Sequence, residues 1–140
     1  MRITMETDYA VRIVYCLARE DRVMGAQEIC DSTGVAFRFA LKILGKLRAG
    51  GIIVSFRGTN GGYKLSKKPE DITLLTVYQA VDGDVLINRC VDEEPCSIPG
   101  QDGHCVFHED FVRINNMLKD ALGQVSFARA AHARKRDVHG

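Results

Sequence analysis

The sequence predicts a mostly α-helical fold with a small β-hairpin wing, in which a winged helix-turn-helix domain is followed by a long dimerisation helix. Three observations predict it: two short amphipathic segments joined by a glycine turn, a glycine-rich basic segment between two apolar runs, and a longer apolar stripe further along. We expect a winged helix-turn-helix domain over residues 1–82, a cysteine-bearing loop over 83–104, and a dimerisation helix, short last helix and basic tail over 105–140.

Three helices are expected before the wing. The first covers about 7–19, with Thr7 and Asp8 as capping residues, and the second covers about 25–32 and ends at Gly34. The third covers about 36–48. Its apolar stripe consists of Phe37, Ala40, Leu41, Leu44 and Leu47.

The wing is predicted from the alternation of strand and turn residues. Apolar runs at 52–56 and 63–65 flank the segment 57–62, which is basic and contains three glycines. A fourth helix is expected at about 73–82, capped by Thr73. This order of elements separates a DNA-binding domain from an ordinary helical hairpin.

The segment from 105 to about 123 has apolar residues at alternating steps of four and three, which is typical of a coiled-coil seam. Because the seam follows a complete small domain, we predict that it forms a homodimer interface. A short last helix capped by Ser126 and a frayed, solvated tail containing Arg134, Lys135 and Arg136 are expected after it. The seam consists of Phe107, Phe111, Ile114, Leu118, Ala121 and Val125.

Charge is distributed unevenly along the chain. Residues 1–68 carry 12 Lys and Arg against 6 Asp and Glu, whereas residues 69–125 carry 3 against 11. The basic part therefore suits a polyanion such as double-stranded DNA. No apolar run approaches the ~20 residues that span a bilayer, and the N-terminal residues lack the apolar core of a signal peptide. We expect a cytoplasmic protein with no membrane partner.

Candidate DNA-binding residues lie on the third helix and in the wing. Arg38, Lys42 and Lys46 recur every four residues and so share one helix face. Arg38 is expected to read a base, with Lys42 second, because the N-terminal part of a recognition helix meets base edges and arginine grips guanine with two hydrogen bonds. Lys46 is expected on phosphate.

The wing supplies a second group of candidates. Tyr63 and Lys64 are expected to contact phosphate, which fixes the register of the protein on DNA without reading its sequence. Arg57, beside the wing glycines, suits a narrow minor groove, and Thr59 lies at the same tip.

Cysteine spacing points to a metal centre. The chain has five cysteines, an odd number that argues for reduced thiols, and Cys90, Cys96 and Cys105 crowd one glycine- and proline-containing stretch. Soft thiolate ligands select iron-sulfur clusters, zinc or cuprous copper. Cys16 and Cys30 are expected to be buried small hydrophobic residues.

The fourth ligand is left open by the spacing. His108, three residues after Cys105, is a natural candidate, and His104 or Asp8 of a partner chain are less favoured. Zinc also accepts three cysteines and one histidine, although its ligands usually come as close cysteine pairs, which this stretch lacks.

Catalytic motifs are missing from the sequence. There is no phosphate-cradling loop before a helix, no nucleophile elbow and no Cys-x-x-Cys pair. A thiol redox enzyme is the alternative class, and the missing Cys-x-x-Cys pair counts against it. We therefore predict that the protein is not an enzyme.

Several of these motifs together resemble the IscR/NsrR-type regulators of the Rrf2 family. The resemblance lies in the start MRIT followed by DYA at 8–10, the helix end LRAGG at 47–51, the RGxxGGY wing at 57–63 and the triple cysteine. It implies a homodimer with a winged-helix domain, a long helix crossing its partner and a cluster loop between them. Members respond to cluster supply, nitric oxide, oxygen or iron status.

The resemblance also implies a ligand set. The family's cluster cysteines correspond to Cys90, Cys96 and Cys105, and the histidine ligand of the IscR branch corresponds to His108. In one NsrR branch an aspartate placed like Asp8 reaches the partner's cluster, with an arginine like Arg12 nearby. The gap of eight residues between Cys96 and Cys105, where many members have five, leaves a two-iron or a four-iron cluster open.

The sequence thus predicts a homodimeric DNA-binding repressor whose operator binding is controlled by an iron-sulfur cluster. The alternative is a cluster-free winged-helix regulator that uses the same cysteines as a thiol switch or a zinc site.

Overall fold

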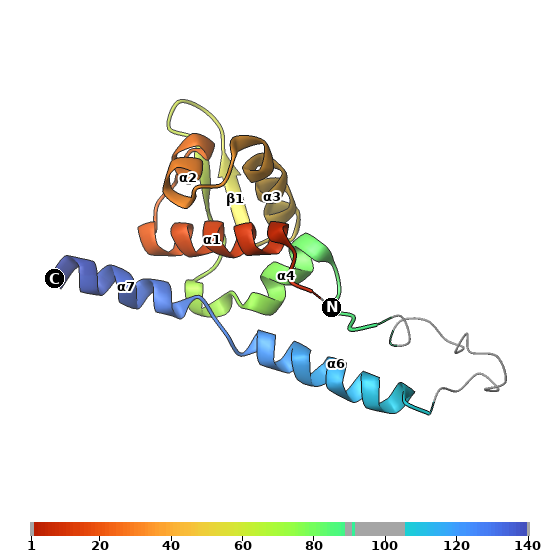
Figure 1. The fold of residues 1–140 in the computed structure, drawn as a ribbon. Coiled ribbons are helices and arrows are strands. Elements are labelled where there is room, and N and C mark those ends of the chain that lie inside the picture. Colours follow the sequence, from red (N-terminus) through yellow and green to blue (C-terminus); the bar gives the residue numbers. More distant parts are fainter. Residues whose placement is uncertain (1, 89–90, 92–105, 140) are drawn as a thin grey trace.

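Elements appear in the order that the sequence predicts. The structure is a computed structural model that describes residues 2–88, 91 and 106–139. Figure 1 shows α2, α3 and the hairpin on one side of α1, and α4, α6 and α7 on the other. In chain order the elements are α1 (Met5–Glu20), α2 (Ala26–Thr33), α3 (Phe37–Ala49), β1 (Ile53–Phe56), β2 (Gly62–Leu65), the 3-10 turn η1 (Pro69–Asp71), α4 (Leu74–Asp82), α6 (His108–Gly123) and α7 (Ala128–His139).

Helix α1 begins earlier than the sequence predicts. Its N-cap is Thr4, whose side chain accepts a hydrogen bond of 3.2 Å from the Thr7 amide. Thr7 is therefore inside the helix, and Asp8 follows it on the exposed side. The prediction that Thr7 and Asp8 cap the helix is wrong because Thr4, three residues upstream, already satisfies the first free amides.

The helix-turn-helix is confirmed. Helix α2 ends at Gly34, which has φ 75° and donates its backbone N–H to the Cys30 carbonyl oxygen, and only two residues separate it from the start of α3. This left-handed conformation suits glycine because a Cβ atom disfavours it. The turn fixes α3 across α1 and α2.

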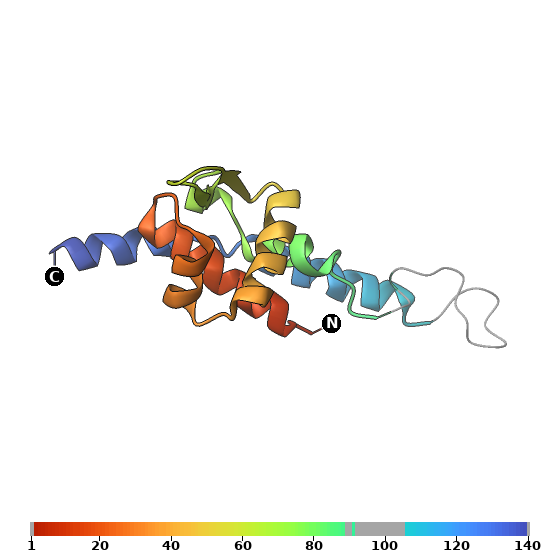
Figure 2. The same ribbon diagram turned by 90° about the horizontal axis from the view of Figure 1, so that it is seen from above.

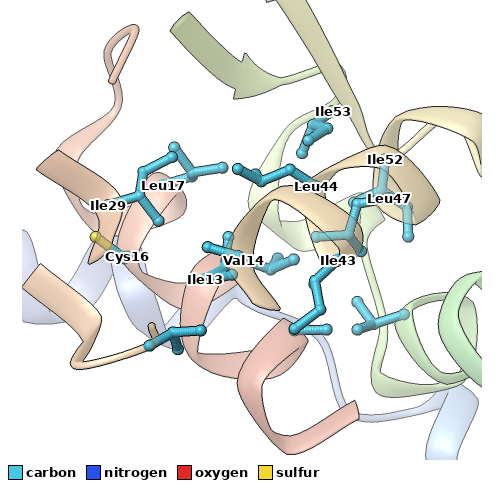
Figure 3. Packing of buried hydrophobic residues seen from close by; sticks show 14 of the residues in the cluster. Ile13, Val14, Cys16, Leu17, Ile29, Ile43, Leu44, Leu47, Ile52 and Ile53 are labelled. Carbon is cyan, nitrogen blue, oxygen red and sulfur yellow. The ribbon is translucent and has the colours of Figure 1, made fainter. Parts of the chain in front are cut away.

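The hydrophobic core lies between these three helices and β1. Figure 3 shows labelled side chains of α1, α2, α3 and β1 pointing into this common interior. Cys16 and Cys30 are buried, as predicted, with exposed fractions of 4% and 7%. The largest fully buried side chains are Ile13, Leu17, Met24, Ile29, Ile43, Leu44, Leu47, Ile53 and Ile72.

The predicted wing is a two-stranded antiparallel hairpin. Ile53 pairs with Leu65 at its base and Phe56 with Gly62 at its tip. A Cβ atom at Gly62 would collide with the Met24 carbonyl oxygen, and one at Gly61 would collide with that of Phe56. The two consecutive glycines are therefore what lets the hairpin turn and pack on the segment before α2.

Helices α4, α6 and α7 follow the wing. Thr73 caps α4 as predicted, in a capping box with Thr76. Residues 106 and 107 form a turn, so the long helix begins at His108 and not at 105. Seen from above, α6 and α7 extend beyond opposite ends of the domain (Figure 2).

The last helix differs from the prediction. Helix α7 continues to His139, so residues 134–136 have helical backbone and do not form a frayed tail. The start of α7 is anchored: Phe127 and Ala130 are buried, and the Phe127 amide donates to the Pro69 and Ile72 carbonyl oxygens. Packing against α1 and η1 favours a helix there, since tertiary contacts stabilise helices more than propensity does.

Within the described residues, none of the helices has both the length and the apolar character needed to cross a membrane.

Candidate nucleic-acid interface and cysteine segment

Helix α3 buries one face and exposes the other. The inward row consists of Ala40, Ile43, Leu44 and Leu47, none of which is exposed. Phe37 and Leu41, predicted to belong to this apolar stripe, are 47% and 43% exposed. The prediction was wrong for these two because the row that meets the core is centred on 40, 43, 44 and 47, which puts 37 and 41 at its edge.

Arg38 lies at the exposed N-terminal end of α3. Its guanidinium carbon is 4.7 Å from the centroid of the neighbouring Phe39 ring. Stacking on an aromatic face uses the plane of the guanidinium and leaves its N–H donors at the edge, where they suit a base or a phosphate.

Lys42 and Lys46 share one carboxylate. The Nζ atom of Lys42 is 2.7 Å from Oε1 of Glu6, and that of Lys46 is 2.7 Å from Oε2. Lys46 also donates to the Val81 carbonyl oxygen at 3.2 Å. The two hydrogen bonds from the lysines lower the pKa of Glu6 to about 2, so its carboxylate is ionised at neutral pH. The predicted cationic stripe is thus tied at two points to the start of α1.

The wing residues fall into two groups. Arg57 and Thr59 at the tip, and Lys64 on β2, are exposed. Tyr63 is half-buried and packs on the core, and its backbone exchanges two hydrogen bonds, of 2.8 and 2.9 Å, with Met24. Through its backbone and its ring, Tyr63 therefore anchors the wing to the helical domain.

The polypeptide that leads toward the cysteines is held on α6 by one buried amide. Asn115 is 2% exposed; its Nδ2 donates to the Val85 carbonyl oxygen at 2.8 Å, and its Oδ1 accepts from the Ile87 amide at 2.9 Å. A second link is the ion pair between Asp84 and Lys119, at 2.9 Å. Lys119 and the Val85 amide together lower the pKa of Asp84.

The end of α4 is joined to the start of α1. The Asp82 carboxylate accepts hydrogen bonds from the hydroxyls of Thr4, at 2.7 Å, and Thr7. Thr7 is buried. Residues 81–87 therefore contact α1, α3 and α6 within one short stretch of chain.

The candidate cluster ligands are only partly covered by the structure. Cys90, Cys96, Cys105 and His104 lie outside the described residues. His108 is the first residue of α6. Within the described part of the chain, no three His, Cys, Asp or Glu side chains form a group that could hold a metal ion.

Asp8, the remaining ligand candidate, is exposed on α1. It forms an ion pair of 3.0 Å with Arg12, and the Arg12 guanidinium carbon is 5.6 Å from the Tyr9 ring centroid.

The apolar seam of α6 is largely uncovered. Asn115 is the only buried residue of α6, whereas Phe107 just before the helix and Ile114 on it are 61% and 45% exposed. Val106 and Met117 are exposed as well. Phe111, Leu118 and Val125 are half-buried.

A groove of about 350 Å³ crosses the exposed side of α1. Its walls include Val11, Tyr15, Leu74, Val125 and Phe127. These residues bring together α1, the start of α4 and the connection between α6 and α7.

Three residues of this region were missed by reasoning from the sequence: Glu6, Asp82 and Asn115. Glu6 lies in the first turn of α1 and Asp82 is the last residue of α4. Neither residue belongs to a sequence motif or to a regular spacing of acidic residues. Asn115 occupies a position between two seam residues, Ile114 and Leu118, but its side chain points to the domain.

Comparison with known proteins identifies the family of the chain. The model of the Rrf2 family, described as "Iron-dependent Transcriptional regulator", matches residues 3–133. Protein aau3 of Rhizobium meliloti is 33% identical over 100 residues, which cover 71% of this chain and 65%, just under two thirds, of that protein. The HTH-type transcriptional regulator IscR of Aliivibrio salmonicida is 28% identical over 129 residues, covering 90% and 74%.

Solved structures share the fold. CymR, the global cysteine regulator of B. subtilis, superposes with a TM-score of 0.73 at 20% identity, over 94% of this chain and 98% of that one. T. potens IscR gives 0.69 at 18% identity, over 91% and 84%. The mostly helical fold with a winged helix-turn-helix is therefore confirmed. The chain belongs to the Rrf2 family of DNA-binding transcriptional regulators, which are not enzymes.

Proposed function

We propose that this protein is a cytoplasmic homodimeric repressor that inserts α3 into the major groove of a palindromic operator, under the control of an iron-sulfur cluster held by Cys90, Cys96 and Cys105. The observation that carries the DNA-binding part is the outward face of α3: Arg38 and Lys42 are exposed on it beside a basic hairpin, while its other face is fully buried.

The proposed DNA contacts fall into three kinds: contacts to base edges, to phosphates and to the minor groove. Arg38, at the N-terminal end of α3, is assigned to a base edge, and Lys42 is the second base-reading candidate. Lys46, Tyr63 and Lys64 are assigned to phosphates, which position the protein. Arg57 at the wing tip is assigned to the minor groove, with Thr59 beside it.

A selection from random duplexes tests the assignment of Arg38. Wild-type protein first recovers its preferred duplex from a pool, and variants are then compared on that duplex and on random-sequence DNA. Arg38→Ala should weaken binding to the selected duplex by about 5- to 150-fold, the value of a good bidentate contact of about 1–3 kcal/mol, with little change on random DNA. Lys64→Ala should weaken both similarly. Equal losses on both duplexes for Arg38→Ala would refute its base-reading role.

Dimerisation is supported by the uncovered seam of α6. Phe107, Ile114 and Met117 leave large apolar side chains in water, which is unfavourable for a monomer. A second copy that crosses this helix would bury them, and twofold symmetry would then present two copies of α3 to two half-sites.

The cluster assignment is supported by donor chemistry. Three thiolates within 16 residues form a soft ligand set that suits iron-sulfur chemistry. His108 is assigned as the fourth ligand, because it follows Cys105 closely and begins α6; His104 and the partner's Asp8 are less favoured. When bound, such a cluster supplies a centre whose oxidation, reaction with nitric oxide or loss changes its bonds to the thiolates.

Residues 81–87 are suited to carry that change to α3. Asn115 holds Val85 on α6, Asp82 binds the start of α1, and the Val81 carbonyl accepts from Lys46 of α3. A shift of the cysteine segment is therefore communicated through hydrogen bonds to two helices of the DNA-binding domain. Coupling of this kind needs only two arrangements that the ligand stabilises unequally.

Removal of one cysteine tests whether the cluster controls operator binding. Cys96→Ser should lack the cluster and bind the selected duplex with an affinity different from that of anaerobically purified wild type. Cys30→Ser, which changes a thiol in α2, serves as control. An unchanged operator affinity in the cluster-free variant would contradict cluster control; tight zinc binding or an affinity set by thiol oxidation would instead favour the cluster-free switch.

A further inference from the structure

The carboxylate of Glu6 lies between two lysines of the helix assigned to the major groove. Glu6 is in the first turn of α1, and its partners Lys42 and Lys46 are one turn apart on α3. Both distances are 2.7 Å, so each carboxylate oxygen accepts from one ammonium group. The side chains of Lys42 and Lys46 are 59% and 35% exposed, so the group lies at the surface of the helix that is proposed to enter DNA.

The pairing changes what this surface offers to DNA. Two free lysines would present two positive charges to phosphates, whereas the three side chains together present one. An ammonium group that already donates to a carboxylate must also exchange that partner before it can bind a phosphate. The carboxylate itself repels the phosphate backbone.

We propose that Glu6 is a specificity-determining residue of the DNA interface, because Lys42 and Lys46 must give up this carboxylate before they can bind phosphates, which weakens binding to arbitrary DNA more than binding to the operator. The inference rests on the proposed entry of α3 into DNA. It adds a residue that acts by suppressing non-specific contacts and not by reading a base.

The selectivity follows from the origin of the two kinds of binding. Non-specific affinity comes almost entirely from phosphate neutralisation, whereas the operator complex also uses base contacts. Arg38, the main base-reading candidate, stacks on Phe39 and is not among the cations that Glu6 engages. Base contacts fix the position of α3 on the operator, where only Lys46 is assigned to a phosphate, whereas a non-specific complex can place both lysines on phosphates. Glu6 therefore weakens non-specific binding more and leaves the contact of Arg38 in place.

The first experiment measures binding to a random-sequence 30-base-pair duplex over a series of salt concentrations. Glu6→Gln keeps the size of the side chain and removes its charge. One additional phosphate contact should steepen the slope of log K against log salt by about 0.9. The ratio of variant to wild-type affinity should therefore be about eight times larger at 0.1 M salt than at 1 M. On the duplex selected by the wild type, affinity should rise by a smaller factor, so the specificity ratio falls.

Glu20→Gln is the matched control. It makes the same change of charge on the same helix and also removes a carboxylate from arginine partners, at 3.6 and 3.9 Å. Glu20 lies fourteen positions after Glu6 on α1, about 21 Å along the axis, or roughly two Debye lengths at 0.1 M salt. Its slope should equal that of the wild type. An equal gain for both variants would mean that net charge alone acts, which overturns the proposal.

A double-mutant cycle tests the pairing itself. Lys42→Gln should change random-duplex affinity less than twofold in the wild type, where Glu6 engages this lysine, but should cancel most of the gain in the Glu6→Gln background. Equal effects in both backgrounds would overturn the proposal. Glu6→Ala should reproduce the result of Glu6→Gln, and circular dichroism confirms that each variant is folded.

Different results would contradict the role of Glu6 and the DNA-binding role of α3. Wild-type protein that binds no duplex at low salt would contradict the DNA-binding role of α3. Wild-type protein that binds DNA, together with a Glu6→Gln variant of identical slope and affinity, would contradict only the role of Glu6.

Discussion

Asn115 of α6 holds Val85 by a hydrogen bond of 2.8 Å from its Nδ2 atom to the buried backbone carbonyl, and so fastens the polypeptide leading to Cys90 onto the helix that follows Cys105. A side-chain amide can pair with a carbonyl and an N–H at once, which makes asparagine suited to hold a segment that has no strand partner. Residues 85–87, which lead toward Cys90, are thus fixed on α6.

Asn115→Ala should lower the free energy of unfolding by about 1–3 kcal/mol, because it leaves the buried Val85 carbonyl without this donor. Urea unfolding measures the change. Asn116→Ala removes the same group from an exposed position on the next residue and should change stability by less than about 0.5 kcal/mol. Equal stability of the two variants would contradict the role of Asn115.

The glycine pair of the wing is expected to be intolerant of substitution. Gly62→Ala places a methyl group against the Met24 carbonyl oxygen and should separate the hairpin from the helical domain, with a lower unfolding temperature. Gly45→Ala, at an open position on α3, should instead stabilise the protein by about 0.5–1 kcal/mol. Calorimetry distinguishes the two. A Gly62→Ala protein as stable as the wild type would contradict the packing of the wing.

Charge on the seam of α6 should separate the proposed dimer. Ile114→Lys places an ammonium group in the apolar face and should weaken self-association at least about 100-fold, because apolar burial is lost and a charge is desolvated. Sedimentation equilibrium measures this. Asn116→Lys, on the opposite side of α6, should leave association unchanged. A monomeric wild type, or an Ile114→Lys protein that associates normally, would contradict the seam as the interface.

The link between Glu6 and α3 should resist acid. Because the two lysines lower the folded-state pKa of Glu6 from 4.5 to about 2, its ionised form contributes stability above pH 4.5, and this contribution is lost as the pH falls toward 2. The carboxyl ¹³C shift of Glu6 should therefore titrate with a midpoint near 2. In Lys42→Gln the midpoint should rise. A wild-type midpoint near 4.5 would show that the carboxylate is not paired.

Much of the domain follows from local residues. Gly34 ends α2 and Thr73 caps α4, as predicted, because a turn and a cap depend on residues a few positions apart. The wing is predictable for the same reason: its two strands are adjacent in sequence and its glycines lie between them.

Contacts between distant residues were not predictable in this way. The pairing of Glu6 with Lys42 joins residues 36 positions apart, and that of Asn115 with Val85 joins residues 30 apart. Both depend on how the helices cross, which periodicity does not reveal. The outward position of Leu41 has the same cause, since only the crossing of α3 over α1 decides which apolar residues are covered.

The visible absorption spectrum of protein purified without oxygen, measured together with iron and acid-labile sulfide, tests the central claim most directly. Cluster binding by Cys90, Cys96 and Cys105 predicts a brown protein with equal amounts of iron and sulfide, and a Cys96→Ser variant that lacks both. A protein that stays colourless after attempted reconstitution would contradict the cluster, while leaving α3 and the wing as its DNA-binding surface.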